Sequence, residues 1–205
     1  MPPCLSTIKE ILTMRILMLG NSFIFANDMP VMLAEMTGAE VVQHTRGGAR
    51  LAEHLNPSTK LGAKTLAAFE NGSWDYVILQ EMSNAPVTSK KAFLRSVTQL
   101  CELIHDNGAT PLLYATWAYK RNSEKMNSMS LSYDEMAAQM YEAYHEAATR
   151  NNALVADVGQ RFYELSETQE LYAGDGCHPN EAGSRLAAEV IAAAITANMT
   201  NGDRV

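Results

Sequence analysis

Five short apolar segments alternate with segments of helical character along the chain, and this alternation predicts the fold. Each apolar segment has the length of one buried strand, and helix-capping residues or apolar residues at 3.6-residue spacing follow it. Because a helical segment separates each strand from the next, the strands should pair in parallel. The pattern predicts a three-layer α/β/α sandwich with a five-stranded parallel sheet, whose strands cover 14–20, 40–45, 74–80, 111–117 and 153–158.

The helical segments have recognisable ends. The amphipathic segment 86–106 carries its apolar residues on one face and is followed by Asn107-Gly108, a typical helix end. Ser132 and Glu135 have the spacing of a capping box, in which each side chain bonds the backbone N–H of the other. The polar segment 119–130 is expected to be a mobile loop over the strand ends. Helices are expected at 28–37, 50–56, 58–70, 86–106, 132–150, 161–165 and 179–197.

Composition and charge restrict the classes of function. A chain of 205 residues suits a single domain, here 1–205, in which the segments 1–13 and 198–205 are expected to be peripheral. Hydrophobic residues make up 47% and charged residues 19%, as in ordinary soluble globular proteins. The net charge of −7 and the scattered Lys and Arg residues argue against nucleic-acid binding, which needs clustered basic residues.

The cysteines and the N-terminus add two further expectations. Cys4, Cys101 and Cys177 are odd in number and far apart, so they indicate neither a disulfide framework nor a zinc site. No metal and no other cofactor is therefore expected. Residues 1–13 lack the apolar core of a signal peptide, and no stretch is long enough to span or bind a membrane as a helix. A cytoplasmic location is expected, although a misassigned start codon would leave export open.

A polar residue or a glycine pair follows every predicted strand. Open α/β sheets bind ligands in the crevice beyond the carboxyl ends of their strands. Five such segments on one edge predict an active site for a small-molecule substrate there. In chain order the segments carry Ser22, Gly47-Gly48, Gln80 to Asn84, Trp117 to Tyr119, and Asp175 with His178.

Ser22, Asp175 and His178 have the chemistry of acyl transfer. A serine hydroxyl becomes a good nucleophile when an imidazole removes its proton, and a carboxylate holds that imidazole in the correct tautomer. Asp175 and His178 could supply the carboxylate and the base from one tight loop. Each residue also has an alternative role. Ser22 could cap a helix, Asp175 could form an Asp-Gly turn, and His178 could be a cap or surface residue.

Negative charge that develops on a carbonyl oxygen needs hydrogen-bond donors that are already in place. The candidate donors are the N–H of Ser22, the N–H of Gly47 or Gly48, and a side-chain amide from Gln80 or Asn84. Spacing alone does not decide between the two amides. Two aromatic residues after the fourth strand could stack on a sugar face or pack beneath the loop; these are Trp117 and Tyr119.

Three blocks of this sequence resemble those of the SGNH (GDSL-type) hydrolases. Gly20-Asn21-Ser22 is similar to the first block, usually Gly-Asp-Ser, and Asp175-Gly-Cys-His178-Pro179 is similar to the last block, Asp-x-x-His-Pro. The second block resembles Arg46-Gly-Gly-Ala-Arg-Leu51, in which Gly48 is the preferred match for the donor glycine. The resemblance implies the flavodoxin-like fold of that superfamily and a Ser-His-Asp esterase.

The third block departs from the usual Gly-x-Asn-Asp. Gln80-Glu-Met-Ser-Asn84 is similar to the Gln-Gly-Glu-Ser-Asn of sialate and acetylxylan esterase relatives but lacks the glycine. The resemblance implies a short-chain substrate, an acetyl ester of a carbohydrate or of another small polar alcohol. The altered block favours one alternative, a non-catalytic carbohydrate-binding or scaffolding domain. A nucleotide-binding protein is disfavoured, since neither Gly-x-Gly-x-x-Gly nor a Walker motif follows the first strand.

Overall fold

One parallel sheet of five strands forms the centre of the protein. The structure is a computed structural model that describes residues 13–202, so the predictions for 1–12 and 203–205 lie outside the described residues. The strand order is β2-β1-β3-β4-β5, with every neighbouring pair parallel, which confirms the predicted fold class. The strands are β1 (Arg15–Gly20), β2 (Glu40–Thr45), β3 (Tyr76–Leu79), β4 (Thr110–Tyr114) and β5 (Leu154–Ala156).

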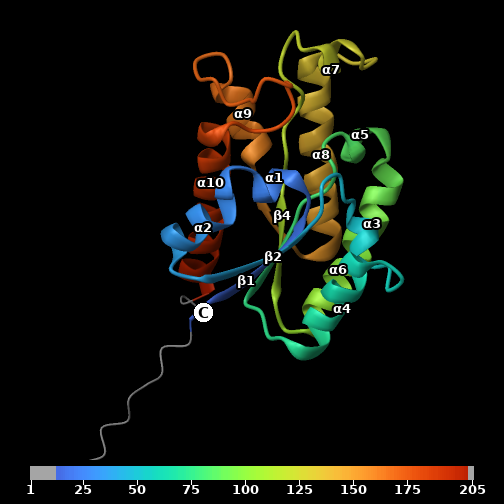
Figure 1. Ribbon diagram of the computed structural model, residues 1–205, viewed down its shortest axis with the longest axis vertical. Coiled ribbons are helices and arrows are strands. Elements are labelled where there is room, and N and C mark those ends of the chain that lie inside the picture. The colour runs from blue at the N-terminus through green and yellow to red at the C-terminus, as the bar shows by residue number, and fades with distance from the viewer. Residues whose placement is uncertain (1–12, 203–205) are drawn as a thin grey trace, which may run out of the picture.

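Helices cover both faces of this sheet. Helices α2 and α10 pack together on one face, and α4, α6 and α8 lie on the other (Figure 1). The layers are those of an α/β/α sandwich. The helices are α1 (Ser22–Phe25), α2 (Met29–Thr37), α3 (Leu51–His54), α4 (Lys60–Asn71), α5 (Ala85–Thr88), α6 (Lys90–Asp106), α7 (Glu124–Asn127), α8 (Tyr133–Asn151), α9 (Val158–Leu165) and α10 (Glu181–Gly202), with a 3-10 turn η1 at Ala26–Asp28.

The central strands of the sheet are buried on both faces, as their continuous apolar segments predict. Residues Ile16–Leu19 of β1 and Val77–Leu79 of β3 are fully buried. The register aligns the carboxyl ends of neighbouring strands, because Gly20 pairs with Thr45 and Leu19 pairs with Leu79. The segments that follow β1, β2 and β3 therefore leave the sheet at the same edge.

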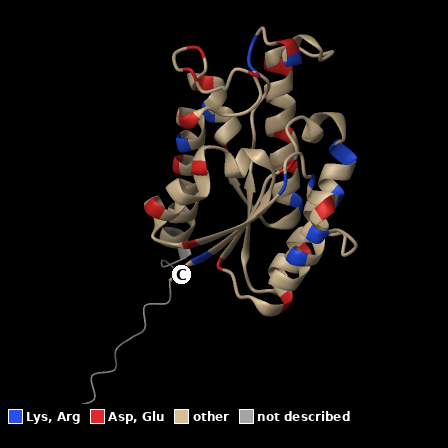
Figure 2. Ribbon diagram, viewed as in Figure 1, with Lys and Arg blue, Asp and Glu red and all other residues tan. Residues whose placement is uncertain are grey.

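Charged residues are spread over the outer helices, the loops and the strand ends (Figure 2). Basic residues recur along α4 and α6, but acidic residues interrupt them on both helices. Both signs of charge are therefore present on this face. Among the described helices, none combines the length and the apolar character that crossing a bilayer requires.

Most predicted helices are present, with shifted ends. The capping box of α8 is confirmed, since the Glu135 N–H donates to Ser132 Oγ and the Ser132 N–H donates to Glu135 Oε2. The expected loop at 119–130 contains the short helix α7. The last helix continues to Gly202, so residues 198–202, expected in a peripheral tail, belong to α10.

Helix α10 also starts later than expected. The prediction places Pro179 at its first position, but Pro179 forms an isolated antiparallel bridge with Tyr172. The side chain of Asn180 accepts from the Gly183 N–H at 2.9 Å and thereby caps the helix. Two residues thus separate His178 from the helix, and the bridge holds the segment that carries it.

Candidate active site

The nucleophile candidate Ser22 lies at the first turn after β1. Gly20 ends the strand where a Cβ atom would lie 2.5 Å from Gln80 Oε1, so only glycine fits there. Asn21 is the residue that caps α1, because its Oδ1 accepts from the Phe23 N–H at 3.1 Å. Ser22 is the first residue of α1 rather than its cap. Its hydroxyl is therefore available for another partner.

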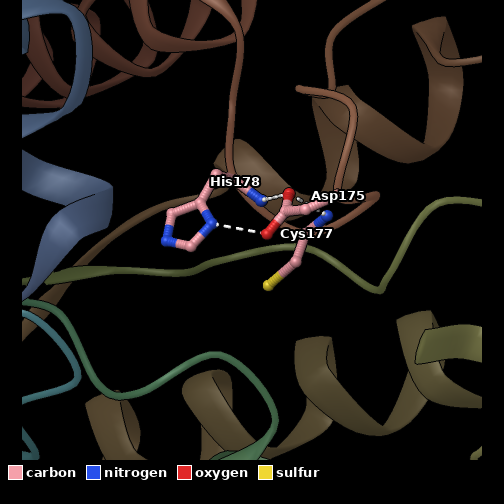
Figure 3. Close-up of side chains that lie close together, drawn as sticks. All are labelled: Asp175, Cys177 and His178. Atoms are coloured by element: carbon pink, nitrogen blue, oxygen red, sulfur yellow. Dashed lines mark hydrogen bonds and ion pairs between the residues drawn. The ribbon is translucent and has the colours of Figure 1, made fainter.

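That partner is His178. Ser22 Oγ lies 2.9 Å from His178 Nε2, although the two residues are 156 positions apart in the sequence. On the other side of the ring, His178 Nδ1 lies 2.7 Å from Asp175 Oδ2 (Figure 3). The structure thus brings the three residues into one hydrogen-bonded series. In this series the imidazole lies between an alcohol and a carboxylate, the geometry needed for proton removal from the alcohol.

The loop from Asp175 to His178 is held by its own hydrogen bonds. Asp175 Oδ1 accepts from the backbone N–H of Cys177 at 3.0 Å and of His178 at 2.9 Å. Gly176 has φ +67° and would clash with Ser123 if it carried a Cβ atom, so glycine is required there. The Lys120 N–H donates to the Gly176 carbonyl at 2.8 Å. The carboxylate and the imidazole therefore sit on one rigid turn.

Asp175 is stabilised as a carboxylate. Burial by itself would raise the pKa of this carboxyl. The hydrogen bonds from Lys125, from the His178 ring and from the two backbone N–H groups outweigh burial and hold the pKa well below its usual range. Asp175 is consequently ionised at neutral pH and can accept from His178 Nδ1.

Two backbone segments near Ser22 carry unused N–H donors. The N–H groups of Ser22, Gly47 and Gly48 form no hydrogen bond within residues 13–202. Asn21 ties the two segments together, since its Nδ2 donates to the Ala49 carbonyl at 3.0 Å. The loop after β2 is thereby fixed next to the first turn of α1.

The two side-chain amides of the third block differ in what they contact. Gln80 is fully buried, its Oε1 accepts from the Asn21 N–H at 2.9 Å, and its Nε2 donates to the Glu81 carbonyl. This contradicts the expectation of Gln80 as an oxyanion donor, because both polar ends of its amide are already bonded. Asn84 is half-buried, and its Nδ2 has only a long contact of 3.9 Å with Met129 Sδ. Asn84 remains the candidate amide.

Trp117 lies beneath the site and does not present a ring face to solvent. It is only 2% exposed, and its ring is stacked between Phe23 and Phe162 at centroid distances of 4.9 and 3.9 Å. Its Nε1 donates to the Cys177 carbonyl at 3.0 Å. Of the two alternatives for Trp117, packing beneath the loop is the one that the structure shows, and a substrate-binding role by stacking is excluded because both ring faces are covered. The ring instead supports the loop that carries His178.

Tyr119 is also unsuited to stacking on a sugar. It is 9% exposed, and its hydroxyl lies 3.1 Å from Ser83 Oγ. Burial raises the pKa of the Tyr119 phenol. The expectation of Tyr119 as a substrate-binding residue is corrected in the same way, since its side chain is buried and its hydroxyl contacts Ser83 in the segment after β3.

Three residues near the site were missed in the sequence. Lys125 Nζ donates to Asp175 Oδ2 at 2.9 Å. Asn27 Nδ2 donates to the Pro179 carbonyl at 3.2 Å and so links the turn after α1 to the segment after His178. Glu81 is 3% exposed, and burial raises its pKa. The role of each depends on a contact with a segment distant in the sequence or on burial in the folded protein, so the sequence holds no signal that selects it.

Side chains that often bind metals occur together at Asp175, Cys177 and His178. One donor atom from each lies within 4.8 Å of the others (Figure 3). Two of the three residues have other partners: both His178 nitrogens are hydrogen-bonded, and the Lys125 ammonium donates to Asp175 Oδ2. The contacts therefore describe a hydrogen-bonded network rather than a coordination site. Cys101 and Cys177 are buried and form no disulfide.

A buried pair of histidines, His44 and His54, lies near the turn that carries Ser22. Their Nδ1 atoms lie 3.4 and 3.0 Å from Thr65 Oγ1. Burial is the main cause that lowers the pKa of both rings to about 4; Lys64 adds to it for His44, and His44 adds to it for His54. Both rings are therefore neutral in the folded protein at neutral pH.

This pair should make the fold sensitive to acid. Between about pH 6.5 and pH 4 the unfolded chain binds protons that the folded chain does not, so the free energy of unfolding should fall as the pH falls. The loss reaches roughly 3 kcal/mol for each ring. Urea unfolding across this pH range measures it. The double variant His44→Gln/His54→Gln should lose this dependence. The control His105→Gln changes an exposed ring and should keep it. If the free energy of unfolding falls equally with pH in the wild type, the double variant and the control, the prediction is contradicted.

A serine, an imidazole and a carboxylate bonded in series at the carboxyl edge of a parallel sheet form the arrangement of a serine hydrolase. The family model described as GDSL-like Lipase/Acylhydrolase matches residues 88–191, about half of the chain. The chain belongs to this family and is a serine hydrolase. The matched segment contains Asp175 and His178, whereas Ser22 precedes it.

One similar solved structure supports the assignment to the hydrolase family, and two others share the fold. A candidate SGNH hydrolase from Slackia heliotrinireducens has 52% sequence identity and a TM-score of 0.87, over 89% of this chain and 99% of that chain. The acetyl xylan esterase AlAXEase has 15% identity and a TM-score of 0.67, over 89% and 100% of the two chains. A catalytic mutant of an acetylxylan esterase from Geobacillus stearothermophilus has 15% identity and a TM-score of 0.63, over 89% and 94%. The last two show the fold alone. A comparison with curated proteins finds no match.

Proposed function

We propose that this hydrolase is an esterase that removes a short acyl group, acetyl above all, from a carbohydrate or another small polar alcohol. The observation that carries the proposal is the hydrogen-bonded series from Ser22 through His178 to Asp175, at 2.9 and 2.7 Å. The acetyl xylan esterases with the same fold support the substrate class. The altered third block does not remove this support, because Ser22, His178 and Asp175 lie within hydrogen-bonding distance in series.

In the proposed reaction His178 is first a base and then an acid. Its Nε2 takes the Ser22 proton while Oγ forms a bond to the ester carbonyl carbon, and Asp175 accepts from Nδ1 and stabilises the resulting imidazolium. The tetrahedral adduct then loses the alcohol, which leaves with the proton from Nε2. Water, deprotonated by the same nitrogen, attacks the acyl-enzyme. The carboxylic acid is released and the Ser22 hydroxyl is restored.

The oxyanion of the adduct needs donors, for which we propose the N–H of Ser22, the N–H of Gly48 and the side chain of Asn84. Among residues 13–202 the two backbone groups have no hydrogen-bond acceptor, and the Asn84 amide has only the long contact with Met129. Gly47 is the alternative to Gly48, since both are exposed with free N–H groups. The role of Gln80 in this scheme is to hold the Asn21 N–H and thereby the backbone that positions Ser22.

The amide of Asn84 can be tested separately from the nucleophile. Asn84→Ala should lower kcat on p-nitrophenyl acetate by about 10²–10³-fold, because one preorganised donor to the oxyanion is removed. KM should change little, since the donor acts mainly on the tetrahedral adduct. Steady-state kinetics measure both values. The matched control is Asn71→Ala, an exposed helix asparagine, which should keep the wild-type kcat. A kcat in Asn84→Ala equal to that control would remove Asn84 from the oxyanion site.

The proposed function is tested by labelling and by a substrate panel. A fluorophosphonate should attach to one serine, and peptide mass spectrometry should locate it at Ser22. A labelled serine elsewhere, or none, would contradict the proposal. Among p-nitrophenyl esters, kcat/KM should be highest for acetate and fall with acyl length, and acetylated sugars should release acetate. A preference for long acyl chains would overturn the substrate class while leaving the nucleophile in place.

A further inference from the structure

Lys125 contacts the same carboxylate oxygen as the candidate base. Its Nζ lies 2.9 Å from Asp175 Oδ2, and His178 Nδ1 lies 2.7 Å from that oxygen. Lys125 Nζ and His178 Nδ1 are therefore at most about 5.6 Å apart, which is the total of the two hydrogen-bond distances. The residue comes from α7, far from both the nucleophile block and the His178 loop in sequence.

The backbone around Lys125 is fixed against the Asp175 loop. Ser123 caps α7 by accepting from the Met126 N–H at 3.1 Å. The same serine packs against Gly176, where a Cβ would lie 2.6 Å from Ser123 Cβ. The Lys120 N–H donates to the Gly176 carbonyl. These contacts keep α7 and the loop together, so the ammonium position is built into the fold.

As an ion pair alone, this contact would stabilise the protein little. The Lys125 and Asp175 side chains are 42% and 39% exposed, and exposed pairs contribute little to stability. The larger consequence is electrostatic, at the neighbouring ring. A positive charge this close disfavours a second positive charge on the imidazole.

The other groups around the imidazole do not cancel this effect. On its own loop it faces the Asp175 carboxylate and the Cys177 thiol, and α1 presents the Ser22 hydroxyl. The Tyr119 phenol, from the segment after β4, faces Lys125 and Asp175. Burial raises the pKa of both the phenol and the thiol, so both are neutral at neutral pH. Two charges remain next to the ring, the Asp175 carboxylate and the Lys125 ammonium.

We propose that Lys125 is a positioning residue that holds the Asp175 carboxylate toward His178 and whose ammonium opposes protonation of the imidazole. The inference rests on the proposed role of His178 as the base. Its consequence is that loss of the Lys125 charge should favour the protonated ring, in which Nε2 cannot accept the Ser22 proton. Lys125 thereby lowers the strength of the base slightly and increases the fraction of enzyme in which the base is available.

The pH dependence of kcat/KM separates this role from simple support of the fold. In Lys125→Met, the acid limb of the profile should move up by about one pH unit, because the ammonium no longer opposes ring protonation. Lys125→Arg keeps the charge and should keep the wild-type limb. The matched control is Lys120→Met, because Lys120 pairs with Glu170 and not with Asp175. In about 1 M NaCl the difference between wild type and Lys125→Met should shrink, as expected for a screened charge.

Two results would overturn the proposal. One is an acid limb in Lys125→Met that coincides with the wild type. The other is a lower plateau with an unmoved limb, which would indicate only structural support. A measurement independent of turnover is the NMR titration of the His178 ring, whose midpoint should rise in Lys125→Met. If no ester is hydrolysed but this midpoint rises, the proposed function fails and the coupling between Lys125 and His178 stands; an unchanged midpoint contradicts the coupling itself.

Discussion

Replacing Ser22 by alanine is expected to lower kcat on p-nitrophenyl acetate by on the order of 10⁶-fold. The substitution removes the one oxygen that bonds to His178 Nε2, and no other hydroxyl is bonded to that nitrogen in the structure of residues 13–202. The helix cap is unaffected, since Asn21 provides it. The melting temperature should therefore stay close to that of the wild type while turnover is lost. Stopped assays with high enzyme concentration, together with circular dichroism melts, measure the two effects.

Replacing His178, the hydrogen-bond partner of Ser22, provides a second test of the same mechanism. His178→Ala should cause a loss of similar size, and the double variant should be no worse than either single variant. Such non-additivity arises because neither group acts without the other. Ser58→Ala, an exposed loop serine, is the control and should keep full activity. Losses that multiply in the double variant would show that the two residues act independently, contrary to the mechanism.

The strands were predictable because their burial is visible in the sequence. Residues Ile16–Leu19 of β1 and all of β3 are apolar without a break and buried on both faces. The parallel order then puts every strand end at one edge. Position at that edge, together with the resemblance of Ser22, Asp175 and His178 to the blocks of a known family, was enough to select the three residues that the structure brings together.

The hydrogen-bond and packing partners of individual loop side chains could not be predicted from the sequence. Gln80 and Asn84 carry the same amide four residues apart, and only the tertiary structure shows that the first bonds the Asn21 and Glu81 backbone. Trp117 has a flat apolar ring that suits a sugar or a core equally, and the outcome depends on Phe23 and Phe162, which come from distant segments. Spacing along the chain contains no information about which way a loop side chain points.

Asn21 illustrates a residue whose role depends on three distant segments at once. Its side chain caps α1 and donates to Ala49, and its N–H donates to Gln80. The first, second and third blocks are thereby tied together around Ser22. An aspartate at this position could cap the helix but could not donate to the Ala49 carbonyl. Asn21 therefore connects the turn that carries Ser22 to the loop after β2, in which the N–H groups of Gly47 and Gly48 are unused.

Replacing Asp175 by asparagine should lower kcat by about 10⁴-fold with the fold intact. The new Oδ1 can still accept from the Cys177 and His178 N–H groups, so the turn should be kept. The new amide nitrogen would take the place of Oδ2 and donate to His178 Nδ1. That bond favours the tautomer with hydrogen on Nε2, which cannot accept the Ser22 proton. The loss is one of orientation and charge rather than of binding.

A second His–Asp pair in the protein supplies the control for this prediction. Asp157 Oδ1 lies 2.8 Å from His145 Nε2, on the surface between α8 and α9 and outside the candidate site. Asp157→Asn therefore makes the same chemical change to a pair with no nucleophile, and kcat should stay within about twofold of the wild type. The acid limb of the wild-type profile should reflect the imidazole and not Asp175, because the pKa of that carboxyl is held well below its usual range. If Asp175→Asn loses less than about tenfold in kcat, or no more than Asp157→Asn, then Asp175 does not orient the base as proposed.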